Sequence, residues 1–156
     1  MKLLYICTHN RCRSIIAEAV TRQWGGPQLE ARSAGSQPSG VVHPLSLKYL
    51  AEAGASIDSL TSQSWDEHSV WAPDIVITVC DQAAAESCPV WFGNAIKVHW
   101  GLSDPSRLEG SEDEIADAFR ATIATLRSRV EKLAAADPDS LDTESLQALF
   151  AQLGAS

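Results

Sequence analysis

The chain has 156 residues, a length typical of one domain, and no Pro/Gly-rich linker divides it. A hydrophobic content of 45% is close to the average for globular proteins and excludes an intrinsically disordered chain. Twelve basic and twenty acidic residues give a net charge of -8, which repels phosphate backbones and anionic lipids, so we expect no nucleic-acid and no membrane partner.

Strands and helices alternate in the first half of the chain. Apolar runs and helical spacing predict, in chain order, a strand at 2–6, a helix at 14–24, a strand at 29–34 and a helix at 44–53. The first helix should end at Gly25-Gly26-Pro27 and the second at Gly54. The apolar run at 2–6 is too short for a signal peptide or a membrane span, so we expect a cytoplasmic protein.

The second half continues the alternation. We predict strands at 74–79 and 95–99, a long amphipathic helix at 112–135, and a last helix at 143–153 that Gly154 breaks. This order predicts an α/β three-layer sandwich, with a small parallel sheet of about four strands and helices on both faces. We expect a single domain over 1–156, with a core at about 1–136 and a C-terminal helical tail at about 137–156.

A cysteine at the end of the first strand begins a polar loop that leads into a helix. The loop reads Cys7-Thr8-His9-Asn10-Arg11-Cys12-Arg13-Ser14. Backbone N–H groups and the helix dipole converge in such a loop and favour an oxyanion, with Arg13 as a bidentate clamp. The same field lowers the pKa of a thiol, and Ser14 could donate a hydrogen bond to the thiolate. We therefore predict that Cys7 is an activated nucleophile facing an anion bound by residues 8–14.

These residues resemble a known family. The segment from Cys7 to Ser14 resembles the phosphate-binding loop of the low-molecular-weight protein tyrosine phosphatase fold, and Asp104-Pro105 resembles its general-acid loop. Three further segments resemble the arsenate reductases built on that fold, namely Ser33-Ala34-Gly35, Gly54 with the segment before it, and His99-Trp100-Gly101. The resemblance covers the chain up to about Asp137.

Two features distinguish a reductase from a phosphatase. Ser106 and Arg107 follow Asp104-Pro105, where the phosphatases usually carry tyrosines that form an aromatic wall. The segment from Cys80 to Cys88 resembles the redox segment of the thioredoxin-coupled arsenate reductases. Two such thiols are needed only for electron transfer, so the resemblance favours the reductase.

The resemblance implies a sequence of steps. Cys7 attacks arsenate, which the loop amides and Arg13 hold, and Asp104 protonates the leaving hydroxide. Cys80 then attacks the Cys7 sulfur, arsenite leaves, and Cys88 attacks Cys80 to carry the disulfide outward. Thioredoxin, or glutathione with glutaredoxin, would reduce that disulfide. The resemblance implies no cofactor, and phosphate or sulfate should bind as an analogue of arsenate.

Other interpretations remain open at this stage. A phosphatase would use Cys7, Arg13 and Asp104 alone, and a non-catalytic oxyanion-binding module would never consume Cys7. Cys80 and Cys88 could be packed core thiols, and Cys12 could be a packed thiol or a protective disulfide partner.

A metal site is also considered. Some reductases of this fold carry a potassium ion near the loop, for which Asn10, Glu18, Ser33 and Thr61 could serve. Gln63 stands where a carboxylate is expected. We therefore assign no metal ligand.

Overall fold

The computed structural model describes residues 1–81, 83 and 93–156. Four parallel strands form one sheet in the order β2-β1-β3-β4. The strands are β1 (Lys2–Ile6), β2 (Glu30–Ala34), β3 (Ile75–Thr78) and β4 (Ile96–His99). The predicted small parallel sheet is confirmed. Its two central strands, β1 and β3, are buried almost throughout, as their unbroken apolar sequences require.

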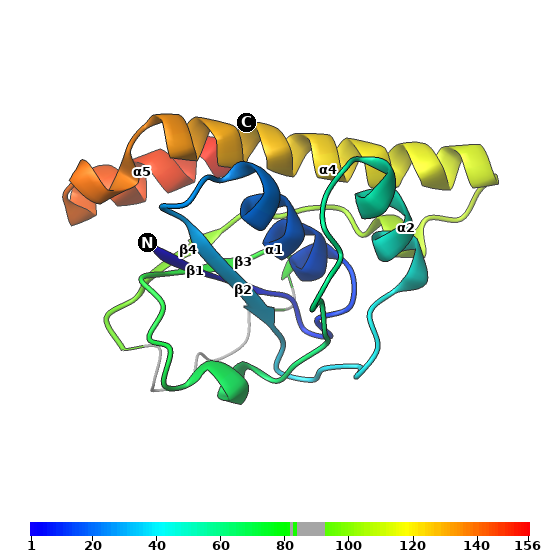
Figure 1. The fold of residues 1–156 in the computed structure, drawn as a ribbon, viewed down its shortest axis with the longest axis horizontal. Coiled ribbons are helices and arrows are strands. Elements are labelled where there is room, and N and C mark those ends of the chain that lie inside the picture. Colours follow the sequence, from blue (N-terminus) through cyan, green and yellow to red (C-terminus); the bar gives the residue numbers. More distant parts are fainter. Residues whose placement is uncertain (82, 84–92) are drawn as a thin grey trace.

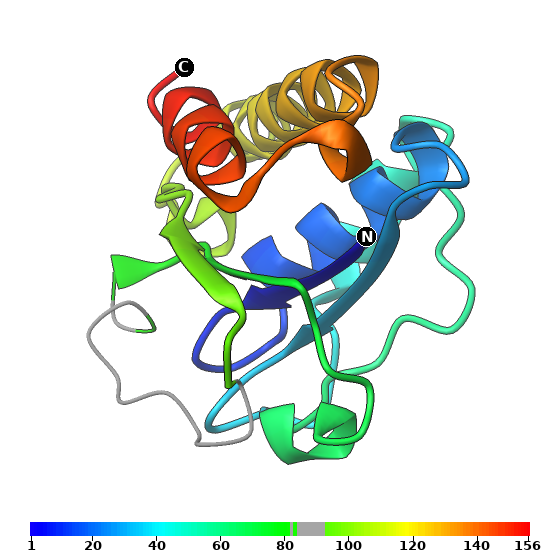
Figure 2. The ribbon, with the colours of Figure 1, turned by 90° about the vertical axis from the view of Figure 1, so that its left-hand side faces the viewer.

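Helices and short 3-10 turns connect the strands. The helices are α1 (Arg13–Trp24), α2 (Pro44–Glu52), α4 (Glu112–Ala135) and α5 (Thr143–Gly154), and the turns are η1 (Trp65–His68), η3 (Pro105–Arg107) and η4 (Pro138–Ser140). Figure 1 shows α4 and α5 side by side along one edge of the molecule, with α1 between α4 and the sheet. Among the described elements, α1, α4 and α5 lie on one side of the sheet, and η1 lies on the other (Figure 2).

The longest helix, α4, has the bounds that its sequence predicts. The Ser111 side chain accepts a hydrogen bond from the backbone N–H of Glu114, and three acidic residues occupy the first turn, where the helix dipole favours negative charge. Its apolar stripe, which includes Phe119, Leu126 and Val130, is buried against the rest of the protein. No helix in the described part of the chain is long and apolar enough to cross a membrane.

The C-terminal tail packs onto the core. The indole N–H of Trp100 donates a hydrogen bond of 2.9 Å to the carbonyl of Phe150 in α5. The rings of these two buried residues stack with their centroids 5.7 Å apart. Gly154, predicted to break this helix, is instead its last residue. A Cβ at Gly154 would lie 2.7 Å from Trp100, so glycine here permits close packing rather than a helix stop.

The strand register places two cysteines at one point. Ile6 at the end of β1 pairs with Thr78 at the end of β3, so Cys7 and Cys80 follow neighbouring strands at the same edge of the sheet. The strand order reverses between β1 and β3, because β2 lies on one side of β1 and β3 on the other. Such a switch point is where parallel α/β sheets bind ligands.

Candidate active site

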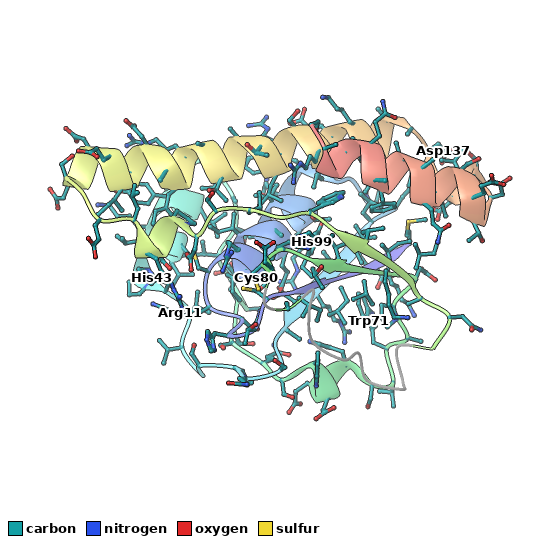
Figure 3. The ribbon with its side chains drawn as sticks, turned by 180° about the vertical axis from the view of Figure 1, so that it is seen from behind. Arg11, His43, Trp71, Cys80, His99 and Asp137 are labelled. Carbon is teal, nitrogen blue, oxygen red and sulfur yellow. The ribbon has the colours of Figure 1, made fainter. Side chains whose placement is uncertain are left out.

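A pocket of about 240 Å³ opens at this edge of the sheet. Its lining residues come from the predicted loop, the end of β3 and the segment before η3, and they are Cys7, Thr8, His9, Arg11, Cys12, Arg13, Cys80, Asp81, Asp104 and Arg107. In Figure 3, Arg11 and Cys80 lie toward the carboxyl ends of the strands, whereas Trp71 and Asp137 lie toward the other end. The structure therefore brings together most of the predicted site residues that it describes.

The loop directs its backbone carbonyls away from the pocket. The carbonyls of Thr8, His9 and Arg11 accept hydrogen bonds from the backbone N–H groups of Gln37, Ser39 and His43, respectively. Because the C=O and N–H of a trans peptide point in opposite directions, the N–H groups of His9 and Cys12 point inward, away from the partners of the Thr8 and Arg11 carbonyls, whereas the N–H of Asn10 donates to the Cys7 carbonyl. Inward amides near a helix N-terminus form a concavity suited to an anion.

Asn10 and Ser14, which the sequence places among the anion-binding residues, have side chains behind the loop. Both are fully buried, and the Asn10 amide donates a hydrogen bond of 2.8 Å to the Ser14 hydroxyl. Neither side chain lines the pocket. Any contact of these two residues with an anion would therefore come from the backbone.

Arg13 extends into the pocket from the start of α1. One guanidinium nitrogen donates a hydrogen bond of 2.8 Å to the carbonyl of Leu102, and another lies 3.6 Å from the carboxylate of Asp104. The buried Nε of Arg13 has no hydrogen-bond partner within the described residues. A guanidinium with a spare buried donor at the pocket wall is suited to hold an oxyanion.

Asp104 is an ionised carboxylate at neutral pH. Burial alone would raise its pKa, but the hydroxyl and backbone N–H of Ser106 both donate to it, at 2.6 and 2.9 Å. The positive charges of Arg13 and Arg107 add to this effect, and the pKa of Asp104 lies below its ordinary value. Asp104 must therefore acquire a proton before it can donate one.

Cys7 and Cys80 both line the pocket, and each changes the pKa of the other. The neighbouring Cys80 thiol raises the pKa of Cys7, contrary to the lowered pKa that the sequence predicts, and burial raises it further. The pKa of Cys80 is lowered to about 5 by the neighbouring Cys7 thiol, with support from the backbone N–H groups of Thr8 and Ala83. The two thiols therefore do not ionise independently: the first proton leaves the pair far more easily than the second.

The other two cysteines differ in what the structure shows of them. Cys12 is buried beside the pocket, and burial raises its pKa to about 11, so it is a neutral thiol. Cys88 and the residues just before it lie outside the described residues. The predicted role of Cys88 therefore stays a prediction.

Sequence reasoning missed two pocket residues. Asp81 lines the pocket directly after Cys80, and its position at the end of a strand was the signal that could have revealed it. Arg107 lies 3.5 Å from Asp104 at the mouth of the pocket. It was noted in the sequence only for replacing an aromatic residue.

Gly35 lets the end of β2 approach the loop, and Gly35→Ala tests how closely the loop is supported. A Cβ at Gly35 would clash with the Thr8 carbonyl oxygen and would lie 2.5 Å from that of Cys7. We expect Gly35→Ala to cost about 3 kcal/mol in the free energy of unfolding and to weaken phosphate binding. Gly110→Ala is the control, because its Cβ meets only the flexible Glu114 side chain. Urea unfolding and phosphate titration measure both, and equal stabilities would contradict the prediction.

Comparison with known proteins agrees with this geometry. The family model described as low molecular weight phosphotyrosine protein phosphatase matches residues 2–147, and so extends into α5. An arsenate reductase of Halalkalibacterium halodurans is 33% identical over 132 residues, which cover 85% of this chain and 94% of that protein. Arsenate reductase 1 of Staphylococcus epidermidis is 37% identical over 129 residues, which cover 82% and 96%.

Solved structures give the same result. A structure described as an arsenate reductase in the phosphate binding state has a TM-score of 0.70 and 28% identity, and the match covers 86% of this chain and 96% of that one. A thioredoxin-dependent arsenate reductase of Corynebacterium glutamicum has a TM-score of 0.60 and 31% identity, with coverage of 83% and 61%. The sequence resemblance is confirmed, and the chain belongs to the low molecular weight phosphotyrosine protein phosphatase family.

Proposed function

We propose that the protein is an arsenate reductase that converts arsenate to arsenite and serves in arsenic detoxification. The observation that carries the proposal is the position of Cys7 and Cys80 in one pocket, at the ends of two neighbouring strands. Hydrolysis of a phosphate ester needs only one nucleophilic thiol at this site. Two thiols in one pocket can together supply the two electrons that a reduction requires, when they are oxidised to a disulfide.

Arsenate binds in the concavity of the loop. The inward N–H groups and Arg13 surround its oxygens, and Arg11 and Arg107 add positive charge at the pocket. These local charges outweigh the net charge of -8 of the whole chain, because a partly enclosed site is screened less than the surface. Ser106 and Arg107, after Asp104-Pro105, provide no aromatic wall for an aryl ester at this position, which favours a free tetrahedral oxyanion.

The first step forms a bond between sulfur and arsenic. The Cys7 sulfur attacks arsenic, one arsenic–oxygen bond breaks, and the oxygen leaves as water with the thiol proton and one proton from arsenate. As the sulfur–arsenic bond forms, the Cys7 thiol becomes acidic, and Asp104, which is ionised at rest and lines the same pocket, takes up its proton and delivers it to the leaving oxygen. The loop amides and Arg13 stabilise the negative charge as it passes from sulfur to oxygen.

The second step transfers the electrons. The Cys80 thiolate attacks the Cys7 sulfur, a disulfide bond forms, and the sulfur–arsenic bond breaks with its electron pair on arsenic. Arsenic is thereby reduced from the +5 to the +3 state, and two thiols are oxidised to one disulfide. The low pKa of Cys80 means that its thiolate is present before the adduct forms.

A thiol relay completes the cycle. Cys88 attacks Cys80, which restores the Cys7 thiol and leaves a Cys80–Cys88 disulfide. A dithiol protein of the thioredoxin class, or glutathione with glutaredoxin, then reduces that disulfide. We place this cycle in the cytoplasm, where such reductants keep thiols reduced. The thioredoxin dependence stated for the Corynebacterium glutamicum relative supports the first reductant.

A single-turnover experiment tests the proposal. Fully reduced protein is mixed with arsenate without added thiol, arsenite is quantified, and the disulfide is mapped by mass spectrometry. We expect one equivalent of arsenite and a Cys80–Cys88 disulfide, and in Cys88→Ser the same arsenite with a Cys7–Cys80 disulfide. Arsenite that forms only after glutathione is added would replace the relay by an external thiol. No arsenite with any reductant would refute the reductase and favour a phosphatase.

A further inference from the structure

A buried chain of polar side chains runs behind the loop, on the side away from the pocket. It begins at Asn10, whose φ of +43° is in the left-handed region, a conformation that costs free energy for a residue with a side chain. The fully buried Asn10 side chain is held on three sides. It donates to the hydroxyls of Ser14 and Ser33, at 2.8 and 2.9 Å, and accepts from the backbone N–H of Gln63 at 2.8 Å.

Ser33 in β2 extends the chain to a carboxylate. Its hydroxyl donates to Oε1 of Glu18 at 2.6 Å. The Ser33 hydroxyl has a single proton, which it donates to Glu18. It can therefore take part in the hydrogen bond with the Asn10 amide only as the acceptor, through an oxygen lone pair. The carboxylate of Glu18 fixes this direction, because it accepts the Ser33 proton and turns the lone pair of Ser33 toward Asn10.

The chain ends at a cation. Glu18 is buried in α1, and burial raises its pKa, an effect that Ser33 and Arg22 oppose. A guanidinium nitrogen of Arg22, one helical turn later, lies 2.7 Å from Oε2 of Glu18. The Nε of Arg22 also donates to the carbonyl of Ala31 in β2 at 3.3 Å. Arg22 therefore joins α1 to β2 and neutralises a charge that would otherwise be buried alone.

We propose that Arg22 is a positioning residue for the reaction: its guanidinium balances the buried Glu18 carboxylate, and through Ser33 this carboxylate holds Asn10 in the conformation that curls the loop around the oxyanion. Arg22 touches neither the pocket nor the thiols. It acts on oxyanion binding through three side chains in series, Glu18, Ser33 and Asn10, each within hydrogen-bonding distance of the next.

A second arginine, Arg32, lies near Glu18 but forms its closest contacts with other residues. Arg32 lines the same small cavity as Glu18 and Arg22. Its guanidinium, however, lies over the ring of Trp71, with the central carbon 4.6 Å from the ring centroid, and also contacts His68. Among the described ion pairs of Glu18, the direct one is with Arg22.

The first test measures phosphate affinity, because inorganic phosphate binds the loop without any redox step. We expect Arg22→Ala to weaken phosphate binding about tenfold, since Glu18 is left buried and unpaired, whereas Arg22→Lys should bind like wild type. Arg120→Ala is the matched control. Arg120 also pairs with a glutamate at 2.8 Å, but its partner Glu52 is exposed and stays hydrated.

Two further measurements separate positioning from a general loss of structure. In Glu18→Gln/Arg22→Ala the amide oxygen can still accept from Ser33 and no charge is left unpaired, so phosphate affinity should return to within about threefold of wild type. Added guanidinium ion, at concentrations too low to denature, should restore phosphate binding in Arg22→Ala and leave the double variant unchanged. If Arg22→Ala fails to fold, the double variant carries the test, since it should fold and bind phosphate.

The inference depends on one part of the proposed function, the binding of an oxyanion by the loop, and does not depend on arsenate reduction. Wild-type phosphate affinity in Arg22→Ala would overturn it, and so would a double variant as impaired as Arg22→Ala and insensitive to guanidinium. Failure of arsenate reduction in the wild-type protein, with the phosphate results as expected, would refute the reductase and leave the role of Arg22 intact.

Discussion

Replacing Cys80 by serine is expected to abolish arsenite formation while leaving oxyanion binding in place. Cys7 can still attack arsenate in this variant, but no thiolate stands next to Cys7 to break the sulfur–arsenic bond. We expect the single-turnover yield of arsenite, without added thiol, to fall by more than about a thousandfold. Quantifying arsenite after acid quenching measures the effect directly.

Two controls make this result specific. Phosphate should bind Cys80→Ser about as well as it binds wild type, because Arg13 and the loop amides are unchanged. Cys12→Ser removes another buried thiol at the pocket and should still yield arsenite, since its raised pKa keeps it neutral and the steps above do not use it. A wild-type yield from Cys80→Ser would mean that another thiol resolves the adduct and would exclude the proposed order of attack.

The sequence predicted the fold closely because local signals and tertiary packing agree in most elements. The apolar run of β1, the Ser111 cap of α4 and the Gly25-Gly26 stop of α1 each lie where their pattern predicts. Gly154 is the exception. Its sequence pattern is that of a helix stop, but its role is set by the Trp100 ring packed against it, a contact that no local pattern reveals.

The site was less predictable, because its electrostatics depend on contacts between distant segments. The motif identified Cys7, Arg13 and Asp104 as neighbours, and the structure places them around one pocket. The resemblance also implied that Cys80 lies within reach of Cys7, and the register of β1 against β3 brings both cysteines to the same edge of the sheet. The predicted lowering of the Cys7 pKa did not take into account the effect of Cys80, which raises it.

Asp104 shows the same limit. An Asp-Pro turn is a short-range signal, and the resemblance supplied the role of proton donor. The structure adds two hydrogen bonds from Ser106 and two nearby guanidinium groups, which together keep the carboxylate ionised. Its protonation state could not be predicted from sequence, because Arg13 is far from Asp104 along the chain.

Titration of the two contacting thiols is expected to reveal a single thiolate near pH 5. In a Cys88→Ser background, which removes the thiol outside the described residues, thiolate absorbance should rise by one equivalent around pH 5, where Cys80 ionises. Cys7 should stay protonated to much higher pH, because ionising it would place two negative sulfurs in contact. Single-turnover reduction should therefore slow as the pH falls through about 5, when the Cys80 thiolate is lost.

Removing the hydrogen-bond donor tests the cause of this shift. Cys7→Ala deprives the Cys80 thiolate of the contact that lowers its pKa most, while burial continues to raise it. The midpoint for Cys80 should therefore move upward from about 5 by more than about one pH unit, which is at least a tenfold loss of thiolate at pH values well below 5. Cys12→Ala should leave the midpoint unchanged. An unchanged midpoint in Cys7→Ala would show that Thr8 and Ala83 alone hold the charge, and Cys80 would then be poised to attack whether or not Cys7 has reacted.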